Sequence, residues 1–230
     1  MTSHSPVLLL SGAGLPAWIW DETRDLLALR ETVVAPRPGT GDAPLSDYVD
    51  AALRSAPWER FAVVAHSSGG VIGAELARRA PHRVTALLAV CAVVPRPGAS
   101  FVASMPFPQR HVLSLAMRFA GTRPPDSAIR RGVAAGLDDA TAARIVADFA
   151  PESVDLYRGR VGRAPLTQPR AYVTTTHDRE LSPALQARFA GNLAPSWRGN
   201  LGAGHLPMLE DAQGVSRAVT TFLAGPPQLS

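Results

Sequence analysis

Residues 61–77 have the sequence FAVVAHSSGGVIGAELA, and this segment constrains the fold more than any other. Its apolar first half predicts a buried strand and its second half predicts a helix, so the chain must reverse in a very tight turn at a serine. Such a turn forces its central residue into strained φ/ψ and needs small residues two positions away on both sides. Ser67 has Ala65 and Gly69 at these positions, whereas Ser68 would have an imidazole at one of them. Ser67 is therefore the candidate nucleophile.

The same residues allow a simpler explanation, in which Ser67 or Ser68 only caps the N-terminus of an amphipathic helix. Serine between small residues is common in alanine-rich proteins, so the motif does not establish a catalytic site by itself. Its meaning depends on whether the chain also supplies the partners that a serine nucleophile needs.

Short apolar runs alternate with helical patterns along most of the chain, which predicts a parallel sheet covered by helices. The expected strands are residues 7–10, 32–35, 61–65, 84–93, 170–175 and 196–201. The expected helices are residues 17–30, 45–56 (capped by Ser46), 68–80, 183–193 and 211–224. A chain of 230 residues is long enough for one sizeable core. We therefore expect an α/β fold with a mostly parallel sheet of about six strands flanked by helices.

The stretch 95–165 interrupts this alternation, because it contains no convincing strand and is rich in proline. Helical patterns over 109–120, 127–135 and 139–149 predict a helical cap here, inserted after the fourth expected strand. The core would then consist of residues 1–94 and 166–230. Ligands of open parallel sheets bind at the carboxyl ends of the strands, and such a cap would cover them.

Apolar side chains of the cap would line a substrate pocket, or would form a small core of the cap itself. The candidates in the cap are Phe101, Met105, Phe107, Met117 and Phe119. In the core, we expect Gly12, His66 and Leu206 to border the same pocket.

Composition restricts the class of partner. All 23 basic residues are arginine, the net charge is +4, and the arginines are scattered along the chain. Nucleic-acid-binding proteins typically carry a basic stripe with interleaved aromatics, which this sequence lacks, so no nucleic-acid partner is expected.

The single cysteine, Cys91, lies in an apolar run and is expected to be a buried small hydrophobe. The apolar stretch 7–10 is too short for a signal peptide or a membrane span. We expect a soluble cytoplasmic monomer or homodimer that does not bind membranes.

A serine hydroxyl is a poor nucleophile until a positioned base takes its proton and an acid holds that base in the right tautomer. Asp178 follows the expected strand 170–175 and is the candidate acid, with Glu180 as its rival. His205 follows the last expected strand, which completes the order serine, acid, histidine along the chain. A loop histidine is more often solvated than catalytic, and His177 is a weaker competitor for the role of base.

Acyl transfer also needs donors for the oxyanion of the tetrahedral intermediate. One candidate is the backbone amide of Ser68, directly after the candidate nucleophile. The other is the amide of Ala13, in the turn 11–15 after the first expected strand. This turn lacks the spacing of a dinucleotide-binding fingerprint, and its alternative explanation is an ordinary loop between a strand and a helix.

Together these segments resemble the α/β-hydrolase family over nearly the whole chain, and most of all the small esterases that include plant methyl esterases and hydroxynitrile lyases. The matching motifs are Ser11-Gly12-Ala13-Gly14, Trp18-Ile19-Trp20, Val34-Ala35-Pro36-Arg37-Pro38-Gly39-Thr40-Gly41, Ala65-His66-Ser67-Ser68-Gly69-Gly70, Phe149-Ala150-Pro151-Glu152, Thr176-His177-Asp178 and Gly204-His205-Leu206-Pro207-Met208. The resemblance implies that Ser67, Asp178 and His205 are nucleophile, orienting acid and general base. It also implies an oxyanion hole formed by the amides of Ala13 and Ser68, with no cofactor and no metal.

The sequence departs from this family in three ways. Ser11 replaces the usual histidine before the oxyanion loop, and Arg37 replaces the usual acidic residue before Pro-Gly-x-Gly. The leading antiparallel strand pair of the family is missing. Hydroxynitrile lyases of the subgroup depend on a cap lysine, and a chain without lysine is not expected to share that chemistry.

We therefore expect a serine hydrolase that cleaves a carboxylic ester, thioester or lactone with an apolar portion. One alternative on the same fold is a non-hydrolytic tailoring enzyme of secondary metabolism, which would use His205 as a base for cyclisation, elimination or C–C cleavage. A second alternative is a protein that binds a small apolar ligand without turning it over.

Overall fold

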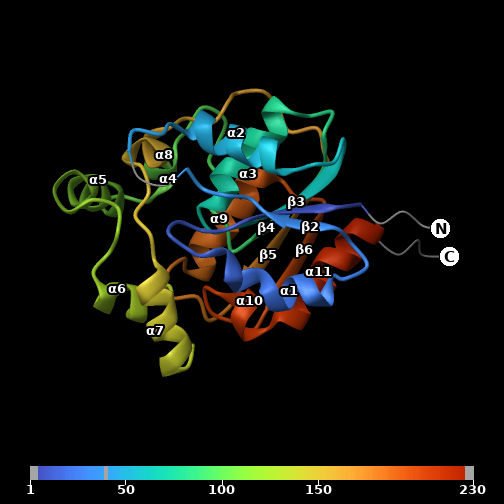
Figure 1. The fold of residues 1–230 in the computed structure, drawn as a ribbon. Helices are drawn as coiled ribbons and strands as arrows, with labels where there is room; N and C mark the ends of the chain where they lie inside the picture. Colours follow the sequence, from blue (N-terminus) through green and yellow to red (C-terminus); the bar gives the residue numbers. More distant parts are fainter. Residues whose placement is uncertain (1–4, 39–40, 226–230) are drawn as a thin grey trace.

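The computed structural model describes residues 5–38 and 41–225, so Gly39 and Thr40 of the quoted motifs lie outside the described residues. In this part of the chain six strands form one parallel sheet in the order β2-β1-β3-β4-β5-β6 (Figure 1). The strands are β1 (Val7–Leu10), β2 (Thr32–Val34), β3 (Phe61–His66), β4 (Val84–Val90), β5 (Arg170–Thr175) and β6 (Trp197–Leu201). The expected α/β fold with about six parallel strands is confirmed.

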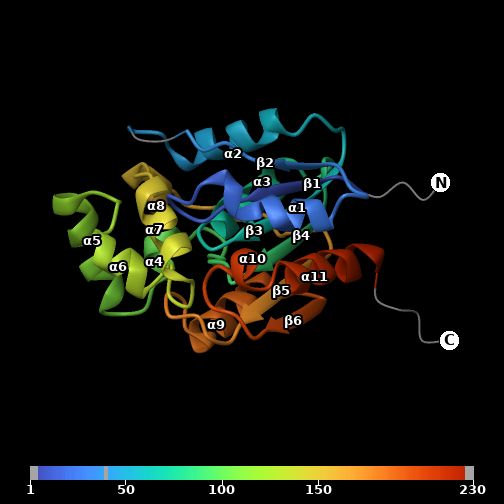
Figure 2. The same ribbon diagram turned by 60° about the horizontal axis from the view of Figure 1, so that its bottom comes forward.

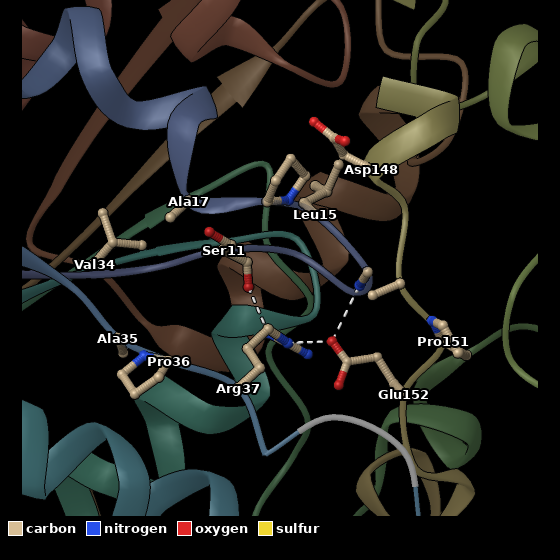
Figure 3. Close-up of a pocket in the computed structure, with 13 residues that line it drawn as sticks. Ser11, Leu15, Ala17, Val34, Ala35, Pro36, Arg37, Asp148, Pro151 and Glu152 are labelled. Atoms are coloured by element: carbon tan, nitrogen blue, oxygen red, sulfur yellow. Dashed lines mark hydrogen bonds and ion pairs between the residues drawn. The ribbon is translucent and has the colours of Figure 1, made fainter. Parts of the chain in front are cut away.

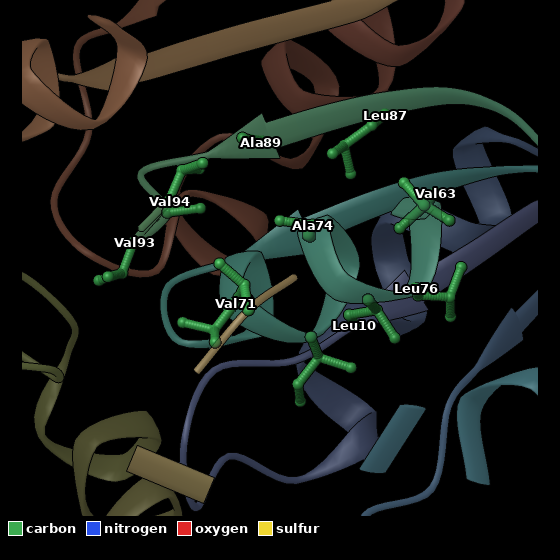
Figure 4. Packing of buried hydrophobic residues seen from close by; sticks show 14 of the residues in the cluster. Leu10, Val63, Val71, Ala74, Leu76, Leu87, Ala89, Val93 and Val94 are labelled. Carbon is green, nitrogen blue, oxygen red and sulfur yellow. The ribbon is translucent and has the colours of Figure 1, made fainter. Parts of the chain in front are cut away.

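The central strands are buried on both faces, as their unbroken apolar sequences require. Successive side chains point to opposite faces, so Leu8 and Leu10 pack into one hydrophobic cluster and Val7 and Leu9 into the other. The first cluster includes side chains of α2 (Leu45–Ser55), α3 (Gly69–Arg79) and α9 (Pro183–Leu193), and part of it is shown in Figure 4. The second includes side chains of the 3-10 turn η1 (Ala17–Trp20), α10 (Pro207–Glu210) and α11 (Ala212–Ala224), while α1 (Asp21–Leu26) packs beside α11. Helices therefore cover both faces of the sheet.

Two details of the predicted helices are wrong. The helix expected over 17–30 divides into η1 and α1, which ends early because its last turn tightens. The amide of Leu27 donates to two carbonyl oxygens, that of Thr23 at 3.0 Å and that of the next residue at 3.1 Å. Ser46 does not cap α2, because the helix already begins at the preceding residue and its N-cap is Pro44.

Five helices lie between β4 and β5 in the described part of the chain, and we call them the inserted helices. They are α4 (Phe101–Ser104), α5 (Gln109–Ala120), α6 (Asp126–Arg131), α7 (Asp139–Asp148) and α8 (Val154–Arg158). Figures 1 and 2 both place them together beyond one end of the sheet. A single antiparallel bridge between Ser100 and Arg160 joins the two ends of this segment. The division into core and cap at residues 95 and 165 stays a prediction.

Across the described residues, the helices are too short or too polar for any of them to cross a membrane. The compartment and the association state expected from the sequence stay predictions.

Candidate active site

The turn between β3 and α3 has the strained geometry that the sequence predicts. Ser67 has a φ of +52°, a value that non-glycine residues rarely adopt. Gly69 lies so close to the end of β1 that a Cβ atom there would be 2.6 Å from the carbonyl oxygen of Leu10. A Cβ atom on Gly70 would be 2.6 Å from the carbonyl oxygen of Val93. The two glycines therefore allow the helix to begin directly under Ser67.

Three side chains from three separate loops meet at this turn in one chain of hydrogen bonds. His205 Nε2 lies 3.0 Å from the hydroxyl oxygen of Ser67, and His205 Nδ1 lies 2.9 Å from Asp178 Oδ2. Both His205 and Asp178 are buried. Because a carboxylate accepts, Nδ1 carries the proton, and the unprotonated Nε2 is left to accept the proton of Ser67. The structure thus brings together the three residues expected to form a triad.

Asp178 is held in place through both of its oxygens. Oδ1 accepts the backbone amides of Glu180 and Leu181, each at 2.8 Å. Oδ2 accepts the hydroxyl of Thr175 at 3.1 Å and the side-chain amide of Gln186 at 3.2 Å, in addition to His205. The rival Glu180 makes no side-chain bond to His205 among the described residues. Gln186 lies on α9, eight residues from Asp178 in sequence, and sequence patterns gave no sign of its role.

Burial and pairing act in opposite directions on this pair. Burial alone would raise the pKa of Asp178, but the hydrogen bond and charge of His205 and the two backbone amides outweigh it, so this pKa lies below its ordinary value. Burial alone would lower the pKa of His205, but the hydrogen bond and charge of Asp178 raise it above its ordinary value. The pair therefore favours an ionised acid beside a histidine that gains a proton readily.

His66 has a different position from the one expected. It is fully buried and does not line the cavity described below; instead its Nε2 donates to the carbonyl oxygen of His205 at 2.8 Å. Burial, followed by the charge of His205, lowers the pKa of His66 to about 3, so its ring is neutral. The thiol of Cys91 points at the same carbonyl oxygen, at 3.5 Å. The ring nitrogens of His66 and His205 and the thiol of Cys91 lie close enough together to resemble a metal site. However, His66 and Cys91 converge because both bind the carbonyl oxygen of His205. These two side chains anchor the backbone of the loop that carries His205.

A cavity of about 420 Å³ lies above Ser67, between the core and the inserted helices. Ser67 and His205 open into it, and its walls are mostly apolar. Three of the expected pocket residues line it, namely Phe101, Met105 and Met117.

The other expected pocket residues do not line this cavity. Phe107 is 74% exposed, beside the ring of His111. Phe119 is 76% exposed, because it comes two residues after Met117 and so faces the other side of α5. Leu206 is fully buried in the second hydrophobic cluster, at the N-cap of α10. Gly12 lies against the nucleophile, since a Cβ atom there would be 2.8 Å from Ser67 Cβ.

The amides expected to bind an oxyanion border this cavity. Ala13 and Ser68 both line it, at the end of β1 and at the start of α3. Neither backbone N–H donates to another group within the described ranges. Both are therefore available to a ligand oxygen near Ser67.

Two charged side chains line the cavity, and they differ in their hydrogen-bond and ion-pair partners. Arg123 is satisfied by Asp126, at 2.8 Å, and by backbone carbonyls such as that of Val146, at 3.0 Å. Glu180 lines the cavity, and in the part of the chain that the structure describes its carboxylate has no ion pair. The formal charges of these two lining residues cancel, but only Arg123 is paired, so the carboxylate of Glu180 is the charge left without an ion-pair partner among the described residues.

Comparisons with known proteins agree with this architecture. The family model described as "Alpha/beta hydrolase family" matches residues 7–218. Among curated proteins, none matches the chain.

Similar solved structures cover almost the whole chain. An extracellular alpha/beta-hydrolase from a Paenibacillus species is 17% identical, with a TM-score of 0.80 over 94% of this chain and 98% of that one. A pyrethroid hydrolase from Sphingobium faniae JZ-2 is 19% identical, with a TM-score of 0.75 over 96% and 98% of the two chains. The methylesterase MES16 from Arabidopsis is 16% identical, with a TM-score of 0.75 over 95% and 99%. At these identities the likeness extends to the fold alone. The expected family resemblance is confirmed, and the chain belongs to the alpha/beta hydrolase family.

Proposed function

We propose that this protein is a serine hydrolase that cleaves carboxylic esters, thioesters or lactones with an apolar portion. The observation that carries the proposal is the hydrogen-bonded chain from Ser67 through His205 to Asp178 at the floor of an apolar cavity. A buried acid, a histidine with a free acceptor nitrogen and a strained serine are the parts that nucleophilic acyl transfer requires.

In the proposed mechanism His205 Nε2 takes the proton of Ser67 while the serine oxygen attacks the carbonyl carbon of the substrate. The amides of Ala13 and Ser68 stabilise the resulting oxyanion. His205 then gives its proton to the leaving group, and an acyl-enzyme remains on Ser67. Water activated by His205 hydrolyses the acyl-enzyme and restores the serine. Asp178 keeps the imidazole in one orientation and tautomer throughout.

The shape of the cavity favours small substrates. A volume of about 420 Å³ and mostly apolar walls suit a small organic ester better than a polymer or a highly charged metabolite. One of the similar structures is named a methylesterase and another a pyrethroid hydrolase, and these names agree with the hydrolysis of an ester proposed here.

Steady-state kinetics with a series of 4-nitrophenyl esters of increasing acyl length would test the proposal. We expect hydrolysis by the wild-type protein, with an initial burst of 4-nitrophenol when deacylation is slow. The Ser67→Ala variant should lose at least about three orders of magnitude in kcat. A folded Ser67→Ala variant that retained activity would favour a non-hydrolytic reaction with His205 as the base.

A further inference from the structure

A buried ion pair lies behind the loop that carries Ala13, on the border of a second, smaller cavity of about 190 Å³ (Figure 3). Arg37 follows β2 and Glu152 follows α7, and the Arg37 Nε donates to Glu152 Oε1. Their side chains are 13% and 3% exposed. Charges are rarely buried unless partners compensate the loss of water, so the other contacts of this pair indicate its role.

Those contacts fall on the two ends of the turn that presents Ala13. Arg37 Nη1 donates to the carbonyl oxygen of Ser11 at 2.8 Å. The amide of Gly14 donates to Glu152 Oε1 at 3.1 Å (Figure 3). The ion pair therefore holds the residues on both sides of the Gly12–Ala13 peptide.

The conformation of Gly14 ties the same turn to the segment that follows α7. Its φ is +67°, and a Cβ atom there would be 2.3 Å from the ring of Phe149. The amide of Ala150 donates to the carbonyl oxygen of Gly14 at 3.0 Å. Both polar groups of Gly14 are thus bonded to residues 150–152, which leaves the turn little freedom.

Glu152 is itself fixed by groups outside the turn. The Tyr48 hydroxyl donates to Glu152 Oε2 at 2.7 Å and accepts the amide of Ser153 at 3.1 Å. Burial and the neighbouring Glu152 raise the pKa of Tyr48 to about 12, so the hydroxyl keeps its proton and remains a donor. Thr122 bonds to the backbone of Glu152 in both directions, at 2.6 Å and 2.8 Å. Glu152 therefore has a fixed position relative to both the core and the inserted helices.

The Arg37–Glu152 ion pair is poorly suited to stabilising the fold. The Nη2 of Arg37 is buried and has no hydrogen-bond partner among the described residues, which costs free energy. Replacing a buried ion pair by apolar residues is often neutral or stabilising. A buried pair with an unsatisfied nitrogen is therefore better explained by the position that it gives to its neighbours than by a gain in stability.

We propose that the Arg37–Glu152 pair positions the backbone amide of Ala13 for the oxyanion, and so controls kcat in the proposed ester hydrolysis, on which this inference rests. It also gives a role to one departure from the family pattern, since Arg37, in place of the usual acidic residue, pairs with Glu152 and binds the backbone carbonyl oxygen of Ser11. Neither charged side chain touches the substrate cavity, so both are positioning residues.

The variants Arg37→Met, Glu152→Gln and the double variant would test this role. Removal of one oxyanion donor costs about 100- to 1,000-fold in kcat, and a displaced donor should cost less. We expect each single variant to lower kcat about 10- to 100-fold with KM within about threefold, and the double variant to cost little more than one single change. Affinity for a trifluoromethyl ketone, which forms a hemiketal oxyanion, should fall in parallel with kcat.

A matched control is the exposed pair of Arg79 and Asp50, which joins α3 to α2 at 2.8 Å. The double variant Arg79→Met/Asp50→Asn should keep kcat, KM and the inhibitor affinity of the wild type. Thermal unfolding of every variant shows that assays are made on folded protein. Tyr48→Phe removes the hydroxyl that binds Glu152 and the amide of Ser153 but keeps the ring and both charges, so it decides the question if Arg37→Met does not fold.

The outcomes separate the two proposals. Wild-type protein without esterase activity or inhibitor binding would overturn the proposed function, and with it this inference. Active wild-type protein together with folded Glu152→Gln and Tyr48→Phe variants at wild-type kcat would overturn the positioning role alone. Variants that lose thermal stability but keep both kcat and the affinity for the ketone would show that the pair is only structural.

Discussion

The substitution Asp178→Asn should stop turnover while leaving the fold intact, and the hydrogen bonds around Asp178 explain why. The two backbone amides at Oδ1, each at 2.8 Å, can only donate, so the single oxygen of an asparagine must face them. Its NH₂ group then faces the side where Asp178 Oδ2 accepts from His205 and Gln186. His205 Nδ1 can bond to that NH₂ only as an acceptor.

This reversal places the proton of the imidazole on Nε2, which lies 3.0 Å from the hydroxyl oxygen of Ser67. A protonated Nε2 cannot take the proton of the serine. In serine proteases the same change of tautomer costs about 10⁴-fold in kcat, which corresponds to about 5 kcal/mol of activation free energy. KM should stay within about threefold, because Asp178 does not line the cavity.

The assay is hydrolysis of a neutral 4-nitrophenyl ester by wild-type, Asp178→Asn and Glu180→Gln proteins. The control variant Asp50→Asn makes the same chemical change at an exposed ion pair on α2. We expect the large loss in Asp178→Asn alone. A folded Asp178→Asn variant with kcat within tenfold of the wild type would refute the assignment of the orienting acid. The same loss in Glu180→Gln would transfer that role to its rival.

Three further predictions concern pH, packing and charge. The value of kcat/KM should rise with pH through a midpoint above 6.5, because the pKa of His205 is raised from 6.5 and only the neutral imidazole accepts a proton; a midpoint below 6.5 would contradict this. Gly69→Ala should lower the free energy of unfolding by about 1–3 kcal/mol, because its Cβ would lie 2.6 Å from the carbonyl oxygen of Leu10. Gly191→Ala, in α9 with open space around it, should instead raise that free energy by about 0.5–1 kcal/mol, and urea denaturation measures both. Glu180→Gln should lower KM for esters that carry a carboxylate by roughly fivefold, corresponding to about 1 kcal/mol, because it removes a negative charge from the cavity wall. KM for neutral esters should not change, and an equal change for both kinds of ester would exclude an electrostatic cause.

Local sequence patterns were sufficient for the sheet and for the three residues at its edge. Every expected strand is present. The most easily recognised are β1, β3 and β4, because parallel strands that are buried on both faces leave nearly unbroken apolar runs in the sequence. Ser67 is recognisable because steric crowding at a tight turn restricts the types of its neighbours. His205 is recognisable from its place after the last strand.

The supporting residues could not be predicted in the same way, because their partners are far apart in the sequence. Arg37 and Glu152 are separated by 115 positions, and only the folded chain shows that they meet behind the Ala13 loop. His66 was expected in the pocket but binds the carbonyl oxygen of His205, 139 positions away. Phe107 and Phe119 failed as pocket residues because composition does not show which face of the inserted segment points to the core.

The most direct test of the central claim is the intact-protein mass after incubation with a small fluorophosphonate, for wild-type, Ser67→Ala and Ser68→Ala proteins. We predict a single adduct on the wild-type protein and none on Ser67→Ala. Ser68→Ala keeps its backbone amide and should still be labelled. An unlabelled wild-type protein, or equal labelling of wild type and Ser67→Ala, would contradict the claim that Ser67 is an activated nucleophile.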